Sequence, residues 1–152
     1  SKIDWTRIQD YTPFSPIQGL EMVPMPVKHG EDMDCLGFMF GTSDVVVYLS
    51  DISRMLPDTM TRIVAAGAAA PSGRVALLVL DALHPSREYF SHFTQEQALA
   101  LAREIRAEKT LLIGMGSGFD HDRDNARLAS LLVTEGLDVQ LARDGLKLHY
   151  NL

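Results

Sequence analysis

The sequence predicts an α/β fold, in which short apolar strands alternate with amphipathic helices, and three observations carry this prediction. The run Val75–Leu80 (VALLVL) is continuously apolar and rich in branched side chains, as is typical of a strand buried on both faces. A segment that starts at Thr94 places apolar residues on one helical face. The chain has 152 residues, 46% of them hydrophobic, which is enough for the core of one domain. We therefore treat residues 1–152 as a single domain.

The first third of the sequence predicts antiparallel strands. Gly19–His29 alternates in part between apolar and polar residues, but Pro24 and Pro26 require an edge strand or a bulged one. Leu36–Phe40 and Val45–Leu49 flank a polar gap that contains a glycine. Such a gap between two apolar runs is typical of a hairpin.

The rest of the sequence predicts alternating helices and strands. A proline opens the first helix, Thr94-Gln95-Glu96-Gln97 fits a capping box at the start of the second, and Gly136 ends the third. Asp144-Gly145 favours a turn, which indicates a closing hairpin. The expected helices are Pro57–Ala66, Thr94–Ile105 and Asp122–Glu135, and the expected strands are Val75–Leu80, Leu111–Ile113, Val139–Leu141 and Leu146–His149.

Charge and composition exclude several classes of function. The formal net charge of -6 argues against non-specific binding to nucleic acid. No apolar run approaches the roughly 20 residues of a membrane span, so we expect no membrane insertion. The single cysteine, Cys35, permits no internal disulfide, which fits a reducing compartment and predicts a cytoplasmic protein. Its apolar neighbours favour a buried structural role for the thiol.

Polar residues follow several of the predicted strands, where α/β folds place their sites. His29 could bind a metal through its imidazole, or could be an ordinary hydrogen-bonded histidine. Asp51 could bridge two cations or act as a general base, or it could cap the following turn. For Asp81, a role as a structural cap or as a carboxylate that supports another side chain is favoured over a role as a metal ligand.

Three further histidines lie near predicted helix starts or loops. His92 precedes a helix and could hold an anion beside its N-terminus, although a solvated loop histidine fits equally well, and that reading is favoured for His84. His121 follows a glycine-rich segment and could be a ligand or a simple hydrogen-bond donor. The carboxylates of Asp120, Asp122 and Asp124 around it would repel a phosphate. Their position at the start of a helix is explained without a function, because the helix dipole favours negative charge there.

Taken together, these strings resemble one family over nearly the whole chain. They are similar to the C-terminal half of metallo-β-lactamase-fold hydrolases, and most similar to eukaryotic relatives of the bacterial phosphonate-pathway cyclic phosphodiesterase. The resemblance implies half of a four-layer αββα sandwich. The strings that carry it are His29–Asp32, Cys35–Gly41, Val47–Ser53, Leu78–Leu83, Ser91–Phe93, Leu112–Met115, Phe119–Asp122, Asp124–Asn125 and Val139–Leu146.

The resemblance also implies site residues and a cofactor. His29 would be a ligand to a divalent metal, zinc or manganese, and Asp51 would bridge two such ions. His92 would contact the scissile phosphate or protonate the leaving group. Ser117 stands where the family usually has a further histidine ligand, so we assign it to substrate binding. His121 lies nearby and is a candidate replacement ligand.

The family's His-x-His-x-Asp-His motif does not occur in these residues. We therefore expect a C-terminal fragment of a metal-dependent hydrolase that acts on a small phosphodiester. On its own, the chain would bind metal weakly and be inactive, because catalytic zinc needs about three protein ligands and an open position. The alternative is a non-catalytic half-fold that forms a homodimer, or that pairs with the missing N-terminal half or another partner chain.

Overall fold

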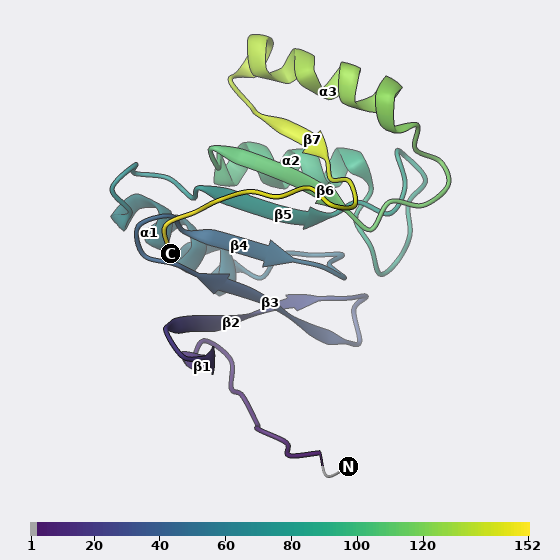
Figure 1. The fold of residues 1–152 in the computed structure, drawn as a ribbon. Coiled ribbons are helices and arrows are strands. Elements are labelled where there is room, and N and C mark those ends of the chain that lie inside the picture. The colour runs from purple at the N-terminus through teal and green to yellow at the C-terminus, as the bar shows by residue number, and fades with distance from the viewer. Residues whose placement is uncertain (1–2) are drawn as a thin grey trace.

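The computed structural model describes residues 3–152, which form one seven-stranded sheet whose strands lie in sequence order (Figure 1). The strands are β1 Phe14–Ile17, β2 Leu20–Lys28, β3 Asp34–Phe40, β4 Val46–Leu49, β5 Leu77–Asp81, β6 Lys109–Ile113 and β7 Val139–Leu141. The helices are α1 Pro57–Ala69, α2 Gln95–Ile105 and α3 His121–Glu135. The predicted α/β class is confirmed.

The sheet is mixed. Strands β1 to β4 pair antiparallel, whereas β4 to β7 pair parallel. Parallel neighbours need a crossover connection, and α1, α2 and α3 provide one between each successive pair. Because β2 and β4 both run antiparallel to β3, the carboxyl ends of β2, β4, β5 and β6 meet at one edge of the sheet. This edge carries the candidate site.

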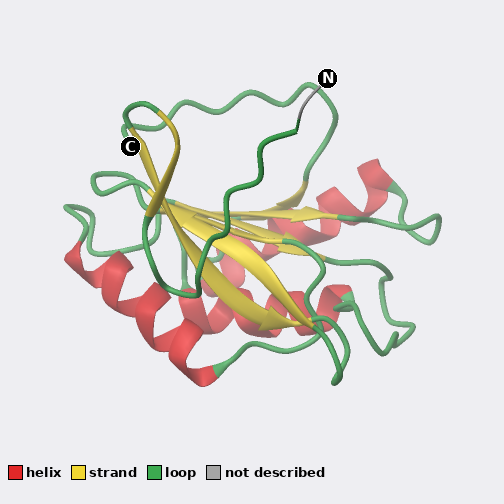
Figure 2. Cartoon of the chain, turned by 90° about the horizontal axis from the view of Figure 1, so that it is seen from below, coloured by secondary structure: helices red, strands yellow, loops and turns green. Residues whose placement is uncertain are grey.

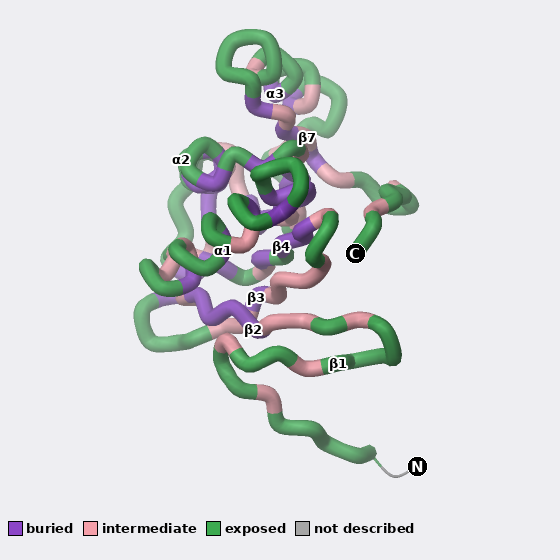
Figure 3. Tube along the Cα trace, turned by 90° about the vertical axis from the view of Figure 1, so that its left-hand side faces the viewer, coloured by how far each residue is buried: buried purple, intermediate pink, exposed green. Residues whose placement is uncertain are grey.

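The main core lies between the sheet and helices α1 and α2. Strands β4 and β5 each direct alternate side chains toward these helices, as the pleat requires. Figures 2 and 3 show the C-terminal segment on the opposite side of the sheet from α1 and α2. The fully buried residues of this core include Met25, Val27, Val47, Leu49, Ile63, Leu78, Leu80, Ala98, Ala102 and Leu112.

The other face of the sheet carries a smaller cluster, and the chain end lies on it. Leu146 and Tyr150 pack against this cluster, which contains the buried Val46, Leu77 and Leu111. The predicted strand over residues 146–149 is therefore wrong. The Asp144-Gly145 turn forms, but the chain then crosses the sheet face instead of returning along β7. The backbones of Asp44 and Asn151 hold the far end of this crossing by a 2.9 Å hydrogen bond.

Two prolines lie inside β2, and the structure explains how the sheet accepts them. Strand β1, which the sequence analysis missed, pairs only with the first part of β2. Pro24 and Pro26 lie beyond that pairing, where only β3 is a neighbouring strand. Their carbonyl oxygens accept hydrogen bonds from Tyr11 N and Thr59 Oγ1 at 2.9 and 2.6 Å. Since proline has no N–H, the predicted edge character is correct for this part of β2.

The predicted capping box of α2 is present. Gln97 N donates to Thr94 Oγ1 at 3.2 Å, and Thr94 N donates to Gln97 Oε1 at 2.8 Å. Replacing Thr94 with alanine should lower the free energy of unfolding by about 1 kcal/mol, because the N–H of Gln97 in the first helical turn loses its side-chain acceptor. Urea denaturation measures this change. Ser130→Ala on exposed α3 is the control, and an equal loss in both variants would contradict the role of the cap.

None of the helices within residues 3–152 is long and apolar enough to cross a membrane.

Candidate metal and catalytic site

His29, Asp51 and His92 converge at the carboxyl edge of the sheet. His29 follows β2, Asp51 follows β4 by two residues, and His92 lies between β5 and α2. Their possible ligand atoms all lie within 4.8 Å of one another. The two imidazole rings meet edge to face, with centroids 4.7 Å apart. The structure therefore brings together three of the predicted site residues, from segments more than 20 residues apart.

The hydrogen bonding of His29 fixes which of its nitrogens is free. His29 Nδ1 lies 2.7 Å from the carbonyl oxygen of Ser91. A carbonyl oxygen only accepts, so Nδ1 carries the proton and the lone pair of Nε2 remains available to a cation. The next residue is the buried Gly30, whose N–H donates to Ser53 Oγ at 2.8 Å. The position of the imidazole is thus fixed by a hydrogen bond of its own ring and by a hydrogen bond of the neighbouring backbone.

Asp51 has an unusual backbone conformation. Its φ is 53°, in the left-handed region that costs a non-glycine residue about 1 kcal/mol. The next residue anchors the turn, because Ile52 is fully buried and its carbonyl accepts a 2.8 Å hydrogen bond from Phe93 N. Half of the Asp51 side chain is exposed, and Oδ1 lies 4.0 Å from His92 Nδ1. The local strain directs a carboxylate toward the two histidines.

A buried carboxylate orients His92. Asp81, at the end of β5, is 3% exposed and places Oδ2 2.7 Å from His92 Nδ1. Burial raises the pKa of the Asp81 carboxyl above its ordinary value, although the hydrogen bond from His92 acts in the opposite direction. Gly114 makes room for this pair, since a Cβ there would lie 2.5 Å from Asp81 Oδ1. Asp81 therefore supports another side chain, which is one of the two roles that its sequence position predicted.

The other two predicted site residues, His121 and Ser117, lie on segments that follow β6. His121 is exposed at the start of α3, where Nε2 lies 3.1 Å from the Ala142 carbonyl and Nδ1 lies 3.2 Å from Asn125 Nδ2. Ser117 lies in an exposed turn after β6. Residues 120–124 cap their own helix: Asp120 Oδ1 accepts from Arg123 N at 2.8 Å. The structure thus does not bring His121 to the ligand atoms of His29 and Asp51.

Cys35 is half-buried and packs against the main core. Burial raises the pKa of its thiol, and the negative charge of Asp51 raises it further. A raised pKa disfavours the thiolate, so Cys35 has the properties of a structural residue, although it is half-buried and not fully buried as predicted.

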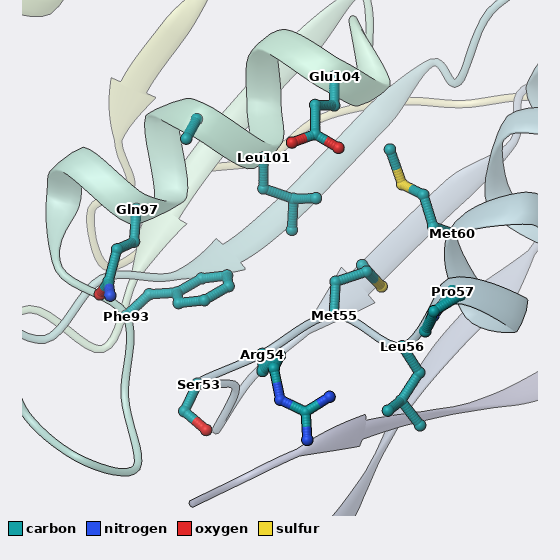
Figure 4. Close-up of a pocket in the computed structure, with 11 residues that line it drawn as sticks. Ser53, Arg54, Met55, Leu56, Pro57, Met60, Phe93, Gln97, Leu101 and Glu104 are labelled. Carbon is teal, nitrogen blue, oxygen red and sulfur yellow. The ribbon is translucent and has the colours of Figure 1, made fainter.

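An apolar cavity lies beside this group rather than at it. Its volume is about 440 Å³, and it lies between the start of α1 and the length of α2 (Figure 4). Arg54 and Glu104 supply its charged groups, and Arg54 is bound by both carboxylate oxygens of Glu31 at 2.9 and 3.2 Å. The lining residues are Ser53, Arg54, Met55, Leu56, Pro57, Met60, Phe93, Gln97, Ala100, Leu101 and Glu104. This mostly apolar space has no histidine in its lining, in contrast to the group of His29, Asp51 and His92.

No family model and no curated protein matches the sequence. Solved structures do match. A diphosphatase from the PhnP family is 26% identical with a TM-score of 0.76, and the match covers 95% of this chain and 48% of that one. The metallo-β-lactamase fold protein YhfI from Bacillus subtilis is 19% identical, with a TM-score of 0.68 and coverages of 93% and 54%.

A third match is Igni18, a metallo hydrolase from Ignicoccus hospitalis, which is 15% identical with a TM-score of 0.65 and coverages of 93% and 58%. The chain spans about half the length of these solved structures. Residues 3–152 therefore have the fold of metallo-β-lactamase-fold hydrolases, as the sequence resemblance implied.

Proposed function

We propose that this chain is part of a metal-dependent hydrolase that acts on small phosphodiesters. The observation that carries the proposal is the convergence of His29, Asp51 and His92 at one sheet edge. The likeness to a PhnP-family diphosphatase supports phosphate ester chemistry in particular. In this proposal, His29 and Asp51 hold a divalent ion, zinc or manganese, and His92 acts beside it on the substrate.

The donor set fits such an ion. Imidazole nitrogen and carboxylate oxygen are ligands that both zinc and manganese accept. Both His29 and His92 have Nδ1 engaged by an oxygen, which leaves Nε2 free in each. A divalent ion bound there would act as a Lewis acid on a phosphoryl oxygen and lower the pKa of water.

His92 is suited to move a proton. The buried Asp81 carboxylate accepts a hydrogen bond from His92 Nδ1 at 2.7 Å and so fixes the orientation of the ring. Nε2 is then the atom that can protonate a leaving-group oxygen, after which the neutral ring retains its proton on Nδ1. His29 Nδ1 donates to a backbone carbonyl instead, and its free Nε2 is the atom that we assign to the metal.

The remaining ligands would come from residues outside this chain. Catalytic zinc sites use about three protein ligands, and His29 and Asp51 supply two. The sheet face opposite α1 and α2 also supports a second layer. The C-terminal segment covers only part of it, and Tyr48 on that face is 40% exposed. The alternative, a non-catalytic half-fold that pairs with itself or a partner, rests on the same exposed face.

The test uses the protein at its natural length, stripped of metal and reloaded with zinc or manganese. Hydrolysis of bis(4-nitrophenyl) phosphate and of 2′,3′-cyclic nucleotides should require the metal. The 152-residue chain alone should be inactive under the same conditions. A metal-loaded protein that hydrolyses none of these esters would contradict the proposal. Light scattering would then test the alternative, which predicts a stable dimer or complex.

Replacing Asp81 with asparagine should lower kcat by about 10- to 100-fold, because the ring loses its carboxylate partner while keeping a hydrogen bond. Steady-state kinetics on bis(4-nitrophenyl) phosphate measures this loss. Asp144→Asn, in an exposed turn, is the matched control. An unchanged kcat in the Asp81 variant would show that the carboxylate is structural only.

A further inference from the structure

The loop before His92 is anchored at both ends. It connects β5 to α2, and a bridge between His84 and Thr94 closes its base. Leu83 N donates to the Phe93 carbonyl at 2.9 Å across the same base. Near its end, the Ser91 carbonyl accepts the hydrogen bond from His29 Nδ1 at 2.7 Å. Residues 85–91 therefore have a defined position relative to the candidate metal site.

Two large aromatic side chains lie on this loop and face solvent. Phe90 is 79% exposed and Tyr89 is 47% exposed. Their rings lie against each other, with centroids 5.3 Å apart and planes inclined by 33°. Apolar surface of this kind, grouped at a candidate site and not scattered singly, is typical of a binding surface.

Both rings border the candidate site directly. The Tyr89 ring centroid lies 5.9 Å from that of His92. Two ring carbons of Phe90 lie 3.3 Å from the position that a Cβ would occupy on Gly30, the residue after His29. A group attached to a phosphate held near His29 and His92 would therefore lie within reach of the aromatic pair. The sequence analysis did not single out either aromatic residue.

We propose that Tyr89 and Phe90 form a subsite for a planar aromatic group of the substrate, an aryl ring or a nucleobase attached to the phosphate ester. Exposed ring faces stack on any planar π system and need no hydrogen-bond pattern to do so. The acidic chain offers little general attraction for a phosphate, so stacking would add selectivity that charge does not provide. The inference rests on the proposed hydrolase function, because it assumes that the phosphate lies beside His92.

The test compares phenylphosphonate with cyclohexylphosphonate, which is similarly apolar but not planar. Binding of each to the natural-length protein loaded with manganese is measured by isothermal titration calorimetry. We expect phenylphosphonate to bind at least about fivefold more tightly, the low end of what one stacked ring contributes. In a Tyr89→Leu, Phe90→Leu double variant this preference should disappear, while cyclohexylphosphonate binds as before. Tyr89→Phe keeps the ring and should keep the preference.

The outcomes separate this inference from the function on which it rests. A preference that survives in the double variant, or equal binding of the two phosphonates to the unaltered protein, overturns the subsite alone. If neither phosphonate binds, the proposed function fails and the subsite fails with it. A second titration uses adenosine 3′-monophosphate, in which a ribose separates the ring from the phosphate. Tighter binding than phenylphosphonate, lost in the double variant, assigns the subsite to a nucleobase, and the reverse order assigns it to an aryl ring.

Discussion

Replacing His92 with alanine is expected to lower kcat for phosphodiester hydrolysis by about 10²- to 10⁴-fold, the range that one general acid contributes. The reason is the position of Nε2, which is the free nitrogen of a ring held by the buried Asp81 at 2.7 Å. Metal content should stay the same, because His29 and Asp51 are the proposed ligands. Steady-state kinetics and elemental analysis on the same preparation measure both quantities.

Two companion variants make this result interpretable. His92→Ala leaves the buried Asp81 without its partner, so the variant could lose stability for that reason alone. His92→Gln offers Asp81 an amide donor and should fold normally, yet it cannot deliver a proton and should show the same loss of kcat. His149→Ala, in the exposed C-terminal segment, is the control. If the variants lose bound metal as well as catalytic rate, His92 is a metal ligand instead.

Replacing Asp51 with asparagine is expected to weaken metal binding by more than about 100-fold, beyond the effect of residues that only support a ligand. Asparagine keeps the side-chain shape and tolerates the left-handed backbone at φ 53°, so the change removes the charge alone. The free energy of unfolding should therefore change by less than about 0.5 kcal/mol. Calorimetric titration with manganese measures the affinity.

The control for Asp51→Asn is Asp144→Asn, which removes the same charge from an exposed turn. It should leave the affinity for manganese unchanged. If both variants bind manganese like the unaltered protein, Asp51 is only a turn residue, which is the other reading that its sequence position allowed. Its strained backbone would then have no functional explanation.

Local patterns predicted the parts of the fold that local interactions determine. The buried strand β5 and the capped helix α2 both have strong signals within a few residues. Strand β1 was missed because it is four residues long, contains Pro16 and pairs irregularly with β2. The path of residues 142–152 depends on the apolar sheet face of Val46, Leu77 and Leu111, which this segment helps to cover and which no local pattern reveals.

The sequence could predict those site residues that directly follow a strand. His29 and Asp51 follow strands that prove to run in the same direction, so they meet at one edge. His121 also follows a strand, β6, yet it lies at the start of α3 with both ring nitrogens in contact with other groups. The distance between a loop residue and a strand end depends on how the loop folds. The same limit hid Tyr89 and Phe90, whose exposure only the folded loop shows.

Paramagnetic line broadening by manganese tests most directly whether the edge group is the metal site. Small additions of Mn²⁺ to the isotopically labelled, metal-free protein broaden the NMR signals of nuclei closest to the bound ion. We expect the backbone amides of residues 29–30, 51–52 and 92–93 to broaden first, because the ligand atoms of His29, Asp51 and His92 lie within 4.8 Å of one another. Broadening that begins instead at the acidic start of α3, residues 120–124, or that is uniform along the chain, would contradict it.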